Sequence, residues 1–525
     1  MPKVFIDDTE VEAPDGFNMI QAAKIAGIEI PHFCYHPGLG VDGNCRLCLV
    51  EIDGVAKPQV ACNTFVKEGL RIRTDTERIK ELRRAVLEFF FLHHPLDCPI
   101  CDQSGECLLQ DFYMTVGQYV SRLDLPKHHK RKVVDVGPRI ILDAERCVLC
   151  RRCVRFCDQI TGTGELRIIN RGHRSEIAIF PDRPLANPYS LNVVDLCPVG
   201  ALTSKDFRFK CRVWYLEATK SVCTGCARGC NTYLEHNEGT IYRCRPRENA
   251  RVNQWWMCDD GRMTYKSLND NRCVVPSIDE QRAGHREAID AIAAKVKTAQ
   301  ERGGDGAIAL FVSPEMSNES LYAAQAFATK VLGTRRIIAG SLRAPGVEDS
   351  LLRRADLFPN RKGCELLSIW RDDLRTELRK GGRVALLIQS DVVDDDPGAA
   401  ADLERFETVI CLATNLTRTT AKAAIIHPVT PHSECEGTFT NFQGRVQRFR
   451  RAMPPKGEAL TVMELLARIA ERLGVTFGWV SMKQIWGEMT RSVSALEGID
   501  PLALGDDGMT VRSLRRDAGA GVEGD

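Results

Sequence analysis

The chain has 525 residues, of which 44% are hydrophobic and 27% charged, a balance typical of a folded protein with several domains. Its net charge of +1 gives no indication of a nucleic-acid partner or an anionic lipid surface. No apolar run approaches the roughly 20 residues that span a bilayer, and the N-terminus lacks the pattern of an export signal. We therefore expect a cytoplasmic protein that makes no direct membrane contact.

Cysteine is the unusual component of the chain. There are 22 cysteines, and 19 of them lie between Cys34 and Cys273. A disulfide framework is typical of small secreted chains, and this chain is neither small nor signalled for export. In a reducing compartment, grouped thiols are interpreted first as metal ligands. Four such groups follow one another along the chain.

The first group follows a hairpin expected at residues 4–14 and a helix expected over Phe17–Ala26. A glycine-rich loop around it lets backbone N–H groups approach a cofactor closely. Two thiols two residues apart and two remote ones suit a [2Fe–2S] cluster, although the first gap is longer than the plant-type spacing. The expected ligands are Cys34, Cys45, Cys48 and Cys62, and a four-cysteine zinc site is the alternative.

A helix expected from about Thr76 to Leu92 leads into the second group. Thr74 and Glu77 fit a capping box at its start. Apolar spacing predicts a core face made of Ile79, Leu82, Val86 and Phe89.

The second ligand group combines one histidine with three cysteines: His94, Cys98, Cys101 and Cys107. Pro95 prevents the preceding helix from continuing past the histidine. His93 is the adjacent rival for the nitrogen ligand. Taken alone this group also suits structural zinc, so the interpretation as a [4Fe–4S] site depends on its neighbours. A neutral imidazole in place of a thiolate removes one negative charge, which predicts a raised reduction potential.

The third group contains a C-x2-C-x2-C run, which places three thiols on one tight loop. This run favours a [4Fe–4S] cubane over zinc, which usually takes two separated pairs. The expected ligands are Cys147, Cys150, Cys153 and the remote Cys197. Cys157 extends the run as in two-cluster ferredoxins. The partner thiols of a second cluster are absent from the sequence, so Cys157 is expected to be a small buried residue.

The fourth group surrounds two expected strands, Thr232–Glu235 and Thr240–Tyr242, which are joined by a turn. Its spacing again suits a [4Fe–4S] cluster, with zinc as the alternative. The expected ligands are Cys223, Cys226, Cys230 and Cys258. Seven cysteines remain outside the groups, and Cys244 is the one most open to reassignment because it lies between group-four ligands.

From about residue 280 the cysteines become sparse and helices alternate with strands. This alternation predicts an open, mostly parallel sheet. No strand–GxGxxG–helix unit is present, so a dinucleotide site is not expected. The expected helices are Glu287–Gln300 and Glu319–Leu332, and the expected strands are Ala307–Val312, Val384–Gln389 and Val409–Ala413.

The order and spacing of all four groups resemble the large iron–sulfur subunit of respiratory complex I, the NADH–quinone oxidoreductase (NuoG in bacteria). The resemblance extends to about residue 475. It rests on the stretches GNCRLCLVEI, HHPLDCPICDQSGECLLQD, RCVLCRRCVRFCD, DLCPVGALTSK and GTFTNFQGRVQ.

The resemblance implies an electron-transfer subunit with one [2Fe–2S] cluster and three [4Fe–4S] clusters on the four groups. The fourth cluster, which only some bacterial members hold, is expected to be structural. A flavin subunit would supply electrons, and a two-cluster ferredoxin subunit would accept them. A [2Fe–2S] subunit and quinone-site subunits would complete the peripheral arm at the inner face of the cell membrane. No catalytic residue is expected on this chain, whereas the whole complex translocates protons.

The C-terminal region resembles the molybdopterin oxidoreductases. In those enzymes a lysine follows the fourth cysteine, whereas this chain has Asp260 in the matching position. We therefore expect a remnant domain that binds no molybdopterin. The alternatives are an NAD-linked formate dehydrogenase-type subunit, which molybdenum or tungsten would indicate, and a multi-zinc scaffold.

The expected fold class is multidomain α+β and α/β. It comprises a β-grasp-type [2Fe–2S] domain, a helical segment with the one-histidine site, a ferredoxin-like domain, a small β cluster domain and a truncated molybdopterin-oxidoreductase-like α/β domain. A disordered tail is expected to follow. The corresponding ranges are 1–78, 79–130, 131–215, 216–272, 273–500 and 501–525.

Overall fold

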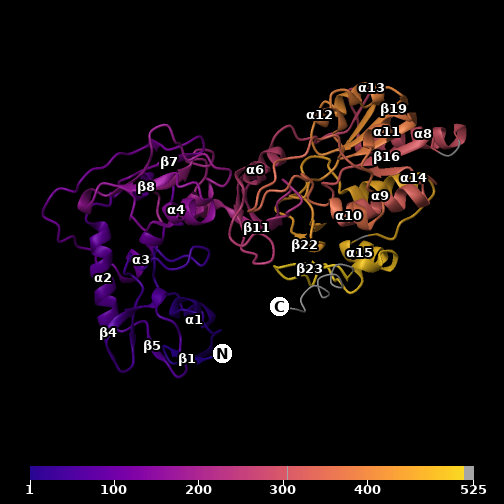
Figure 1. The fold of residues 1–525 in the computed structure, drawn as a ribbon. Helices are drawn as coiled ribbons and strands as arrows, with labels where there is room; N and C mark the ends of the chain where they lie inside the picture. The colour runs from indigo at the N-terminus through magenta and orange to yellow at the C-terminus, as the bar shows by residue number, and fades with distance from the viewer. Residues whose placement is uncertain (304–305, 480, 513–525) are drawn as a thin grey trace. The chain divides into compact units, whose positions relative to one another are not determined.

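A computed structural model describes residues 1–303, 306–479 and 481–512 of the chain. These residues form two compact units, which divide between Leu216 and Glu217 (Figure 1). The division falls next to the boundary expected between the third and fourth domains. The finer domain limits remain predictions. Within the described ranges, no helix is long and apolar enough to cross a membrane.

The first unit begins with a mixed five-stranded sheet in the order β2-β1-β5-β3-β4. The hairpin and helix expected here are confirmed, and α1 packs on the sheet through Met19, Ile20 and Ala23. The Asn18 side chain caps α1 by accepting the Gln21 N–H at 3.0 Å. The elements are β1 Lys3–Ile6, β2 Thr9–Glu12, α1 Met19–Ile25, β3 Leu49–Ile52, β4 Val55–Val60 and β5 Arg71–Arg73.

The helix before group two is confirmed as α2, Glu77–Phe91, but two of its predicted details are wrong. Its cap is Thr76, whose hydroxyl accepts the Ile79 N–H at 3.2 Å, whereas the Thr74 hydroxyl bonds Asp7. Its buried residues are Ile79, Arg83 and Leu87, and the predicted core residue Phe89 is 73% exposed.

The buried face of α2 is therefore rotated from the predicted one. The cause is Arg83, which donates to the Leu49 carbonyl at 2.8 Å and so directs its own side of the helix toward β3. An apolar pattern cannot reveal a buried face that contains an arginine.

The rest of the first unit is built from short elements around the ligand loops. A three-stranded sheet has the order β10-β7-β6, and β8 and β9 form a separate hairpin. A single π-helical turn, Phe156–Ile160, continues α4. The elements are α3 Leu108–Val116, β6 Val134–Asp135, β7 Ile140–Leu142, α4 Arg152–Arg155, β8 Leu166–Ile169, β9 Glu176–Ile179, α5 Asn192–Leu196 and β10 Leu202–Ser204.

The second unit begins with an antiparallel three-stranded sheet that carries group four. The strands expected here are confirmed as β12 and β13, and β11 pairs with β12 along its whole length. Two short helices follow the last cysteine of the group. The elements are β11 Glu217–Val222, β12 Asn231–Asn237, β13 Thr240–Pro246, α6 Asp259–Met263 and α7 Tyr265–Asn269.

The open, mostly parallel sheet is confirmed in the second unit. Seven strands have the order β15-β14-β20-β19-β18-β16-β17, and the five from β20 to β17 are parallel. β14 pairs antiparallel with β20, and the edge strand β15 pairs antiparallel with β14. The strands are β14 Ser277–Ile278, β15 Gln281–Arg282, β16 Ile308–Val312, β17 Ile337–Ala339, β18 Gly382–Ile388, β19 Phe406–Ala413 and β20 Ile425–Pro428.

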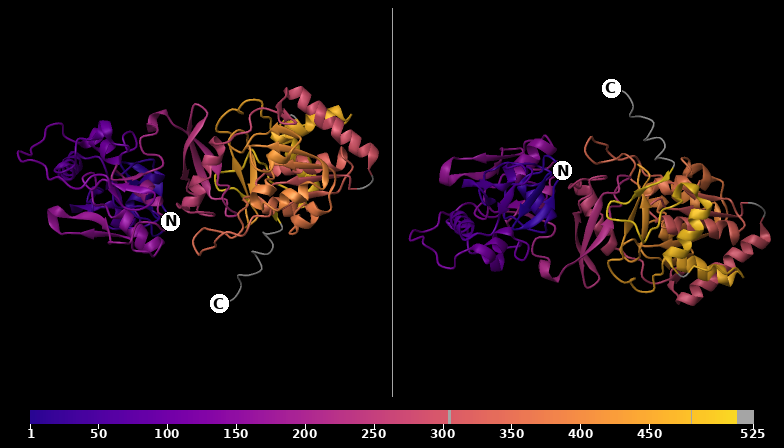
Figure 2. Two further views of the ribbon diagram at one scale, coloured as in Figure 1. Left: turned by 90° about the horizontal axis from the view of Figure 1, so that it is seen from above. Right: turned by 90° about the horizontal axis from the view of Figure 1, so that it is seen from below.

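Helices cover both faces of this sheet (Figures 1 and 2). Leu310 and Leu386 face one helix layer, whereas their strand neighbours Phe311 and Leu387 face the other, as a period of two residues requires. The first layer contains α8 His285–Arg302, α9 Asn318–Lys330, α14 Val462–Arg472 and α15 Met482–Ser492. The second contains α11 Leu374–Arg379, α12 Val392–Asp395 and α13 Ala399–Leu403.

A second small sheet and the short helix α10, Arg361–Leu366, complete this unit. The sheet contains β21 Gly437–Thr440, β22 Arg445–Phe449 and β23 Met509–Thr510. The expectation of a disordered tail from residue 501 is wrong for residues 501–512, because β23 pairs with β22 and Val511 is fully buried. Residues 513–525 lie outside the described part.

Candidate metal centres

The four thiols of group one converge inside the first sheet domain. All four are at most 5% exposed. Cys34 lies within hydrogen-bonding reach of Cys45 and Cys62, and Cys48 within reach of Cys62. Hydrogen bonds from these thiols lower the pKa of Cys34 and of Cys48. The Phe33 N–H points at Cys45 Sγ from 3.5 Å, as a backbone donor toward metal-bound sulfur would.

The side chains of group two surround a small cavity. His94, Cys98, Cys101 and Cys107 line it together with Arg146, Gln110 and Gly200. His93 is not among the lining residues, and its Nδ1 instead accepts the His128 N–H at 3.2 Å. This arrangement favours His94 over His93 as the nitrogen donor.

Burial affects the protonation of the group-two histidine, His94. Burial and the charge of Lys127 lower the pKa of His94 to about 4, so the imidazole is neutral at physiological pH. The Lys127 ammonium donates to the His94 carbonyl at 2.8 Å and fixes that backbone. Burial raises the pKa of Cys107 to about 11.

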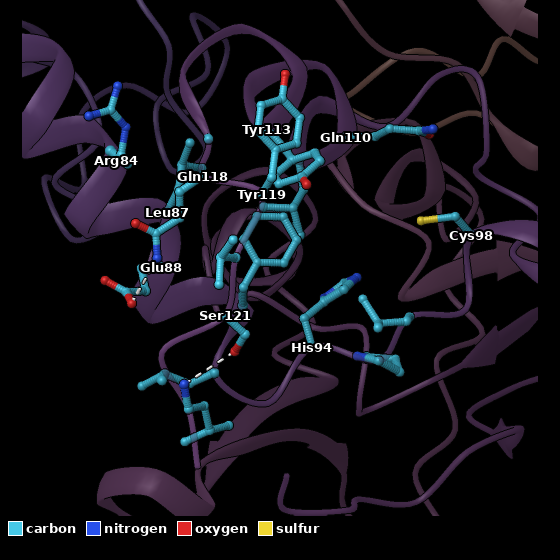
Figure 3. Close-up of a pocket in the computed structure, with 18 of the residues that line it drawn as sticks. Arg84, Leu87, Glu88, His94, Cys98, Gln110, Tyr113, Gln118, Tyr119 and Ser121 are labelled. Carbon is cyan, nitrogen blue, oxygen red and sulfur yellow. Dashed lines mark hydrogen bonds between the residues drawn. The ribbon is translucent and has the colours of Figure 1, made fainter. Parts of the chain in front are cut away.

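A larger pocket of about 310 Å³ is also lined by His94 (Figure 3). Tyr113 and Tyr119 lie in this pocket with His94, and Cys98 lies at its far side (Figure 3). The surrounding surface is apolar: Leu96 is 81% exposed and Tyr119 is 83% exposed. Cys98 of group two is exposed, whereas the other cysteines of groups one, two and three are buried or partly buried.

The thiols of group three surround a second small cavity. Cys147, Cys150, Cys153 and Cys197 line it, and the remaining lining is mostly apolar, including Leu142, Ile177 and Val199. Burial raises the pKa of all four thiols, to about 12 for Cys147 and Cys150. Cys157 is fully buried and is not part of the lining, so the expectation that it is a buried residue is confirmed.

Left-handed backbone shapes the tight loop of group three. Leu149 has a φ of 52° and Arg151 a φ of 65°, conformations that cost residues other than glycine roughly 1 kcal/mol or more. The turn directs the Leu149 N–H at Cys147 Sγ from 3.4 Å. Such a strained conformation persists where surrounding contacts hold the loop in place. With this backbone, all three cysteines of the run line one cavity.

Group four is formed by the first loop of the second unit and the start of α6. The Gly225 N–H lies 3.3 Å from Cys223 Sγ, and the Gly261 N–H lies 3.3 Å from Cys258 Sγ. A Cβ on Gly261 would lie 3.0 Å from Cys223 Sγ and 3.2 Å from Cys258 Sγ, so a larger residue would crowd the site. The thiols of Cys226 and Cys230 interact electrostatically with the thiol of Cys258.

Groups one and three lie next to each other within the first unit. Arg155, which follows Cys153 in α4, donates to the Cys34 carbonyl at 3.1 Å. The Asn44 amide donates to the Leu149 carbonyl at 3.3 Å. The thiolate charge of Cys34 contributes to the raised pKa of Cys150.

Groups two and three are also adjacent. The Leu108 N–H, which follows Cys107, donates to the Pro198 carbonyl, which follows Cys197, at 3.0 Å. The charge of Cys197 contributes to the raised pKa of Cys107. Between groups one and two, by contrast, the contact is aromatic, with the Phe33 ring 5.4 Å from that of Phe112. Hydrogen bonds thus join the loops of group three to those of both other groups, which favours the spatial order one, three, two over the chain order.

Sequence reasoning missed several buried arginines beside the ligands. Arg152 and Arg155 are 7% and 5% exposed in α4, which also carries Cys153. Arg146 lines the cavity of group two and bonds Asp97 at 3.0 Å. The sequence could have indicated two of these arginines. Arg152 and Arg155 are three residues apart on a helix that carries a cysteine, so they lie on the same helix face.

The second unit contains a cavity of about 650 Å³ at the carboxyl ends of the parallel strands, where such folds bind ligands. Its lining includes five carboxylates: Asp260, Asp270, Glu315, Asp391 and Asp394. Arg343 is the one arginine or lysine among the described lining residues, and it bonds Glu315 at 3.1 Å.

This charge does not fit a phosphorylated cofactor such as molybdopterin. Phosphates are bound by uncommitted arginines, lysines and helix N-termini, whereas the sole cation in the described lining is already paired. Asp260, which replaces the expected lysine, lies 3.5 Å from the Arg353 guanidinium. Burial raises the pKa of Asp391 to about 7, a further sign that the cavity disfavours added negative charge.

Family models match five segments of the chain. They describe a 2Fe-2S iron-sulfur cluster binding domain at residues 3–77 and an NADH-ubiquinone oxidoreductase-G iron-sulfur binding region at 83–122. A ferredoxin-like domain of NADH-quinone oxidoreductase subunit 3 matches 137–203. A molybdopterin oxidoreductase Fe4S4 domain matches 216–270, and molybdopterin oxidoreductase matches 375–472. The chain therefore combines iron–sulfur domains with a molybdopterin-oxidoreductase-like domain in a mixed α/β fold.

Curated relatives are named as the G subunit of NADH-quinone oxidoreductase. That of Rickettsia felis is 40% identical over 57% of this chain and 45% of the relative. That of Streptomyces coelicolor is 31% identical over 89% of this chain and 57% of the relative. The iron-sulfur protein 1 of mitochondrial NADH dehydrogenase from Solanum tuberosum is 42% identical over 53% of this chain and 37% of the relative.

The chain thus spans roughly half the length of these relatives. The resemblance inferred from the cysteine motifs is confirmed, since the relatives are named as the iron–sulfur subunit that the motifs indicated. Among solved structures, a chain of an NAD+-reducing [NiFe]-hydrogenase is 32% identical, with a TM-score of 0.37. The match covers 40% of this chain and 91% of that one.

Proposed function

We propose that the chain is an electron-transfer subunit of the peripheral arm of an NADH–quinone oxidoreductase, relaying electrons from a flavin subunit toward quinone. Group one holds a [2Fe–2S] cluster, and groups two, three and four each hold a [4Fe–4S] cluster. Bound clusters supply centres that accept and release one electron at a time. The observation that supports this best is the uninterrupted series of adjacent ligand groups in the first unit.

The spatial order of the groups defines the proposed route, from group one through group three to group two. Group three is the middle position, and its thiols lie in a mostly apolar lining. Backbone N–H groups aimed at sulfur in groups one and three stabilise added negative charge. Group four belongs to the other compact unit, and its proposed role is structural.

The surroundings of group two suit the exit of electrons to a partner protein. Cys98 is exposed, and the exposed side chains Leu96, Ile100 and Tyr119 form apolar surface near it. A two-cluster ferredoxin subunit would cover this surface. The flavin subunit, a [2Fe–2S] subunit and quinone-site subunits complete the proposed peripheral arm at the inner face of the membrane, and the whole complex translocates protons.

Iron suits the ligand groups better than zinc does. Zinc requires its donors at about 2.0–2.3 Å from one point. Groups two and three instead surround cavities, which a cluster of several atoms requires.

A formate dehydrogenase-type enzyme is the second candidate, because a molybdopterin oxidoreductase model matches residues 375–472. The carboxylates in the cavity of the second unit weigh against it. Finding molybdenum or tungsten in the purified protein would restore it.

Metal analysis and spectroscopy of the anaerobically purified full chain test the proposal. The expected content is about 14 iron atoms per chain, from two plus three times four. One [2Fe–2S] and three [4Fe–4S] signals should appear on stepwise reduction. A colourless protein with zinc in place of iron would contradict the proposal.

A further inference from the structure

Arg152 lies at the junction of groups one and three. Its guanidinium donates to the carbonyl of Tyr35, the residue after Cys34, and to that of Leu196, the residue before Cys197, the latter at 3.3 Å. One planar side chain thus joins the loops of two ligand groups. Arg155, on the same helix face, holds the other side of the group-one loop through the Gly40 carbonyl at 2.9 Å.

The charge of Arg152 has no carboxylate partner among the described residues. Its guanidinium donates to neutral carbonyls, and the side chain is 7% exposed. A buried cation without a counter-charge is costly. Burial lowers the pKa of this guanidinium, and negative charge on Cys150, Cys34, Cys197 and Cys45, two from each ligand group, opposes that shift.

This placement gives Arg152 a role that a purely structural arginine would not have. Each cluster gains one negative charge on reduction, and a cation in a low-dielectric interior favours that added charge. A cation between two clusters also screens each from the charge of the other. Resting on the proposed function, we infer that Arg152 is a positioning residue that raises the reduction potentials of the group-one and group-three clusters together.

The neighbouring arginines provide contrasts. Arg151 is half-exposed, and its charge is paired with Asp42 at 3.2 Å. Arg146 is buried beside group two, but it bonds Asp97 and Asp143. Arg155 is also buried and bonds backbone carbonyls, but those carbonyls all belong to the group-one loop. Arg152 is therefore distinguished by bonding the loops of both ligand groups while, within the described ranges, it has no carboxylate partner.

Redox titration followed by electron paramagnetic resonance tests this inference in the assembled complex. In Arg152→Gln the reduced-to-oxidised ratio of both clusters at a fixed potential should fall at least tenfold, equivalent to about 59 mV for a one-electron couple. The group-two potential should stay unchanged as an internal control. Arg73→Gln, which removes a surface charge paired with Asp8 at 2.6 Å and lying outside all four ligand groups, should shift neither cluster by this amount.

Arg152→Lys separates charge from hydrogen bonding. Lysine keeps the cation but cannot hold the Tyr35 and Leu196 carbonyls together, so both potentials should remain near those of the unsubstituted protein. If Arg152→Gln assembles no clusters, the lysine variant alone decides. Lowered potentials in the lysine variant, or loss of both clusters in both variants, would assign a structural role and overturn the inference.

Two further outcomes are distinguishable. Unmoved potentials in an Arg152→Gln protein that contains both clusters would overturn the inference and leave the proposed function intact. Absence of cluster signals from the unsubstituted complex would instead refute the proposed function.

Discussion

Gly200 offers a steric test of group two. It lies three residues after Cys197, and a Cβ added there would lie 2.3 Å from Cys101 Sγ and 3.1 Å from the Gln103 Cβ. Comfortable non-bonded contacts lie at about 3.5–4.0 Å, so the sulfur would have to retreat by about 1.2–1.7 Å. Metal–ligand distances tolerate only about 0.2 Å. Gly200→Ala should therefore remove the cluster of group two.

The φ of Gly200 is not positive, so alanine adds no backbone strain and the effect comes from the contact alone. Iron content should fall from about 14 to about 10 atoms per chain, and crowding should cost about 1–3 kcal/mol of stability. The assay is iron analysis with quantified resonance signals of each cluster.

Gly487→Ala is the matched control for this substitution. Nothing lies within 4 Å of the added carbon in α15, so iron should stay complete and stability should rise by about 0.5–1 kcal/mol. A full group-two signal in Gly200→Ala would refute the reasoning.

Three further predictions concern charge, capping and pH. His94→Cys replaces a neutral ligand by a thiolate, so the group-two potential should fall in a redox titration; an unchanged or raised value would contradict this. Thr76→Ala removes the cap of α2 and should cost about 1 kcal/mol in denaturant unfolding, whereas Thr115→Ala, at an exposed position in α3, should cost less. Burial lowers the pKa of His427 to about 4, so its neutral form is needed in the fold and stability falls as pH drops below about 6.5. This residue should make the free energy of unfolding about 2 kcal/mol lower at pH 5 than at pH 7. His427→Gln should lose that part of the pH dependence, and equal pH dependence in both proteins would contradict the prediction.

The clustering of the cysteines could be seen in the sequence because most thiols of one proposed group recur at short, characteristic spacings. The long helices α8 and α9 were predictable from their apolar period, and β16 and β18 from their continuous apolar runs. These features depend on local sequence. The ligand assignments themselves remain predictions that the convergent side chains support.

The spatial order of the groups was not predictable, because it depends on contacts such as Arg155 to the Cys34 carbonyl, across more than a hundred residues. The buried face of α2 was missed for a related reason, since Arg83 takes a core position through one bond to Leu49. The pairing of Met509 with Val446 was hidden by a polar, glycine-containing sequence that resembles a tail.

The central claim is that group three stands between groups one and two and carries electrons from one to the other. Dipolar coupling between reduced clusters, measured by pulsed electron paramagnetic resonance, tests this most directly. Coupling of the group-three cluster to each of the other two should exceed the coupling between those two. Strongest coupling between groups one and two would contradict the account.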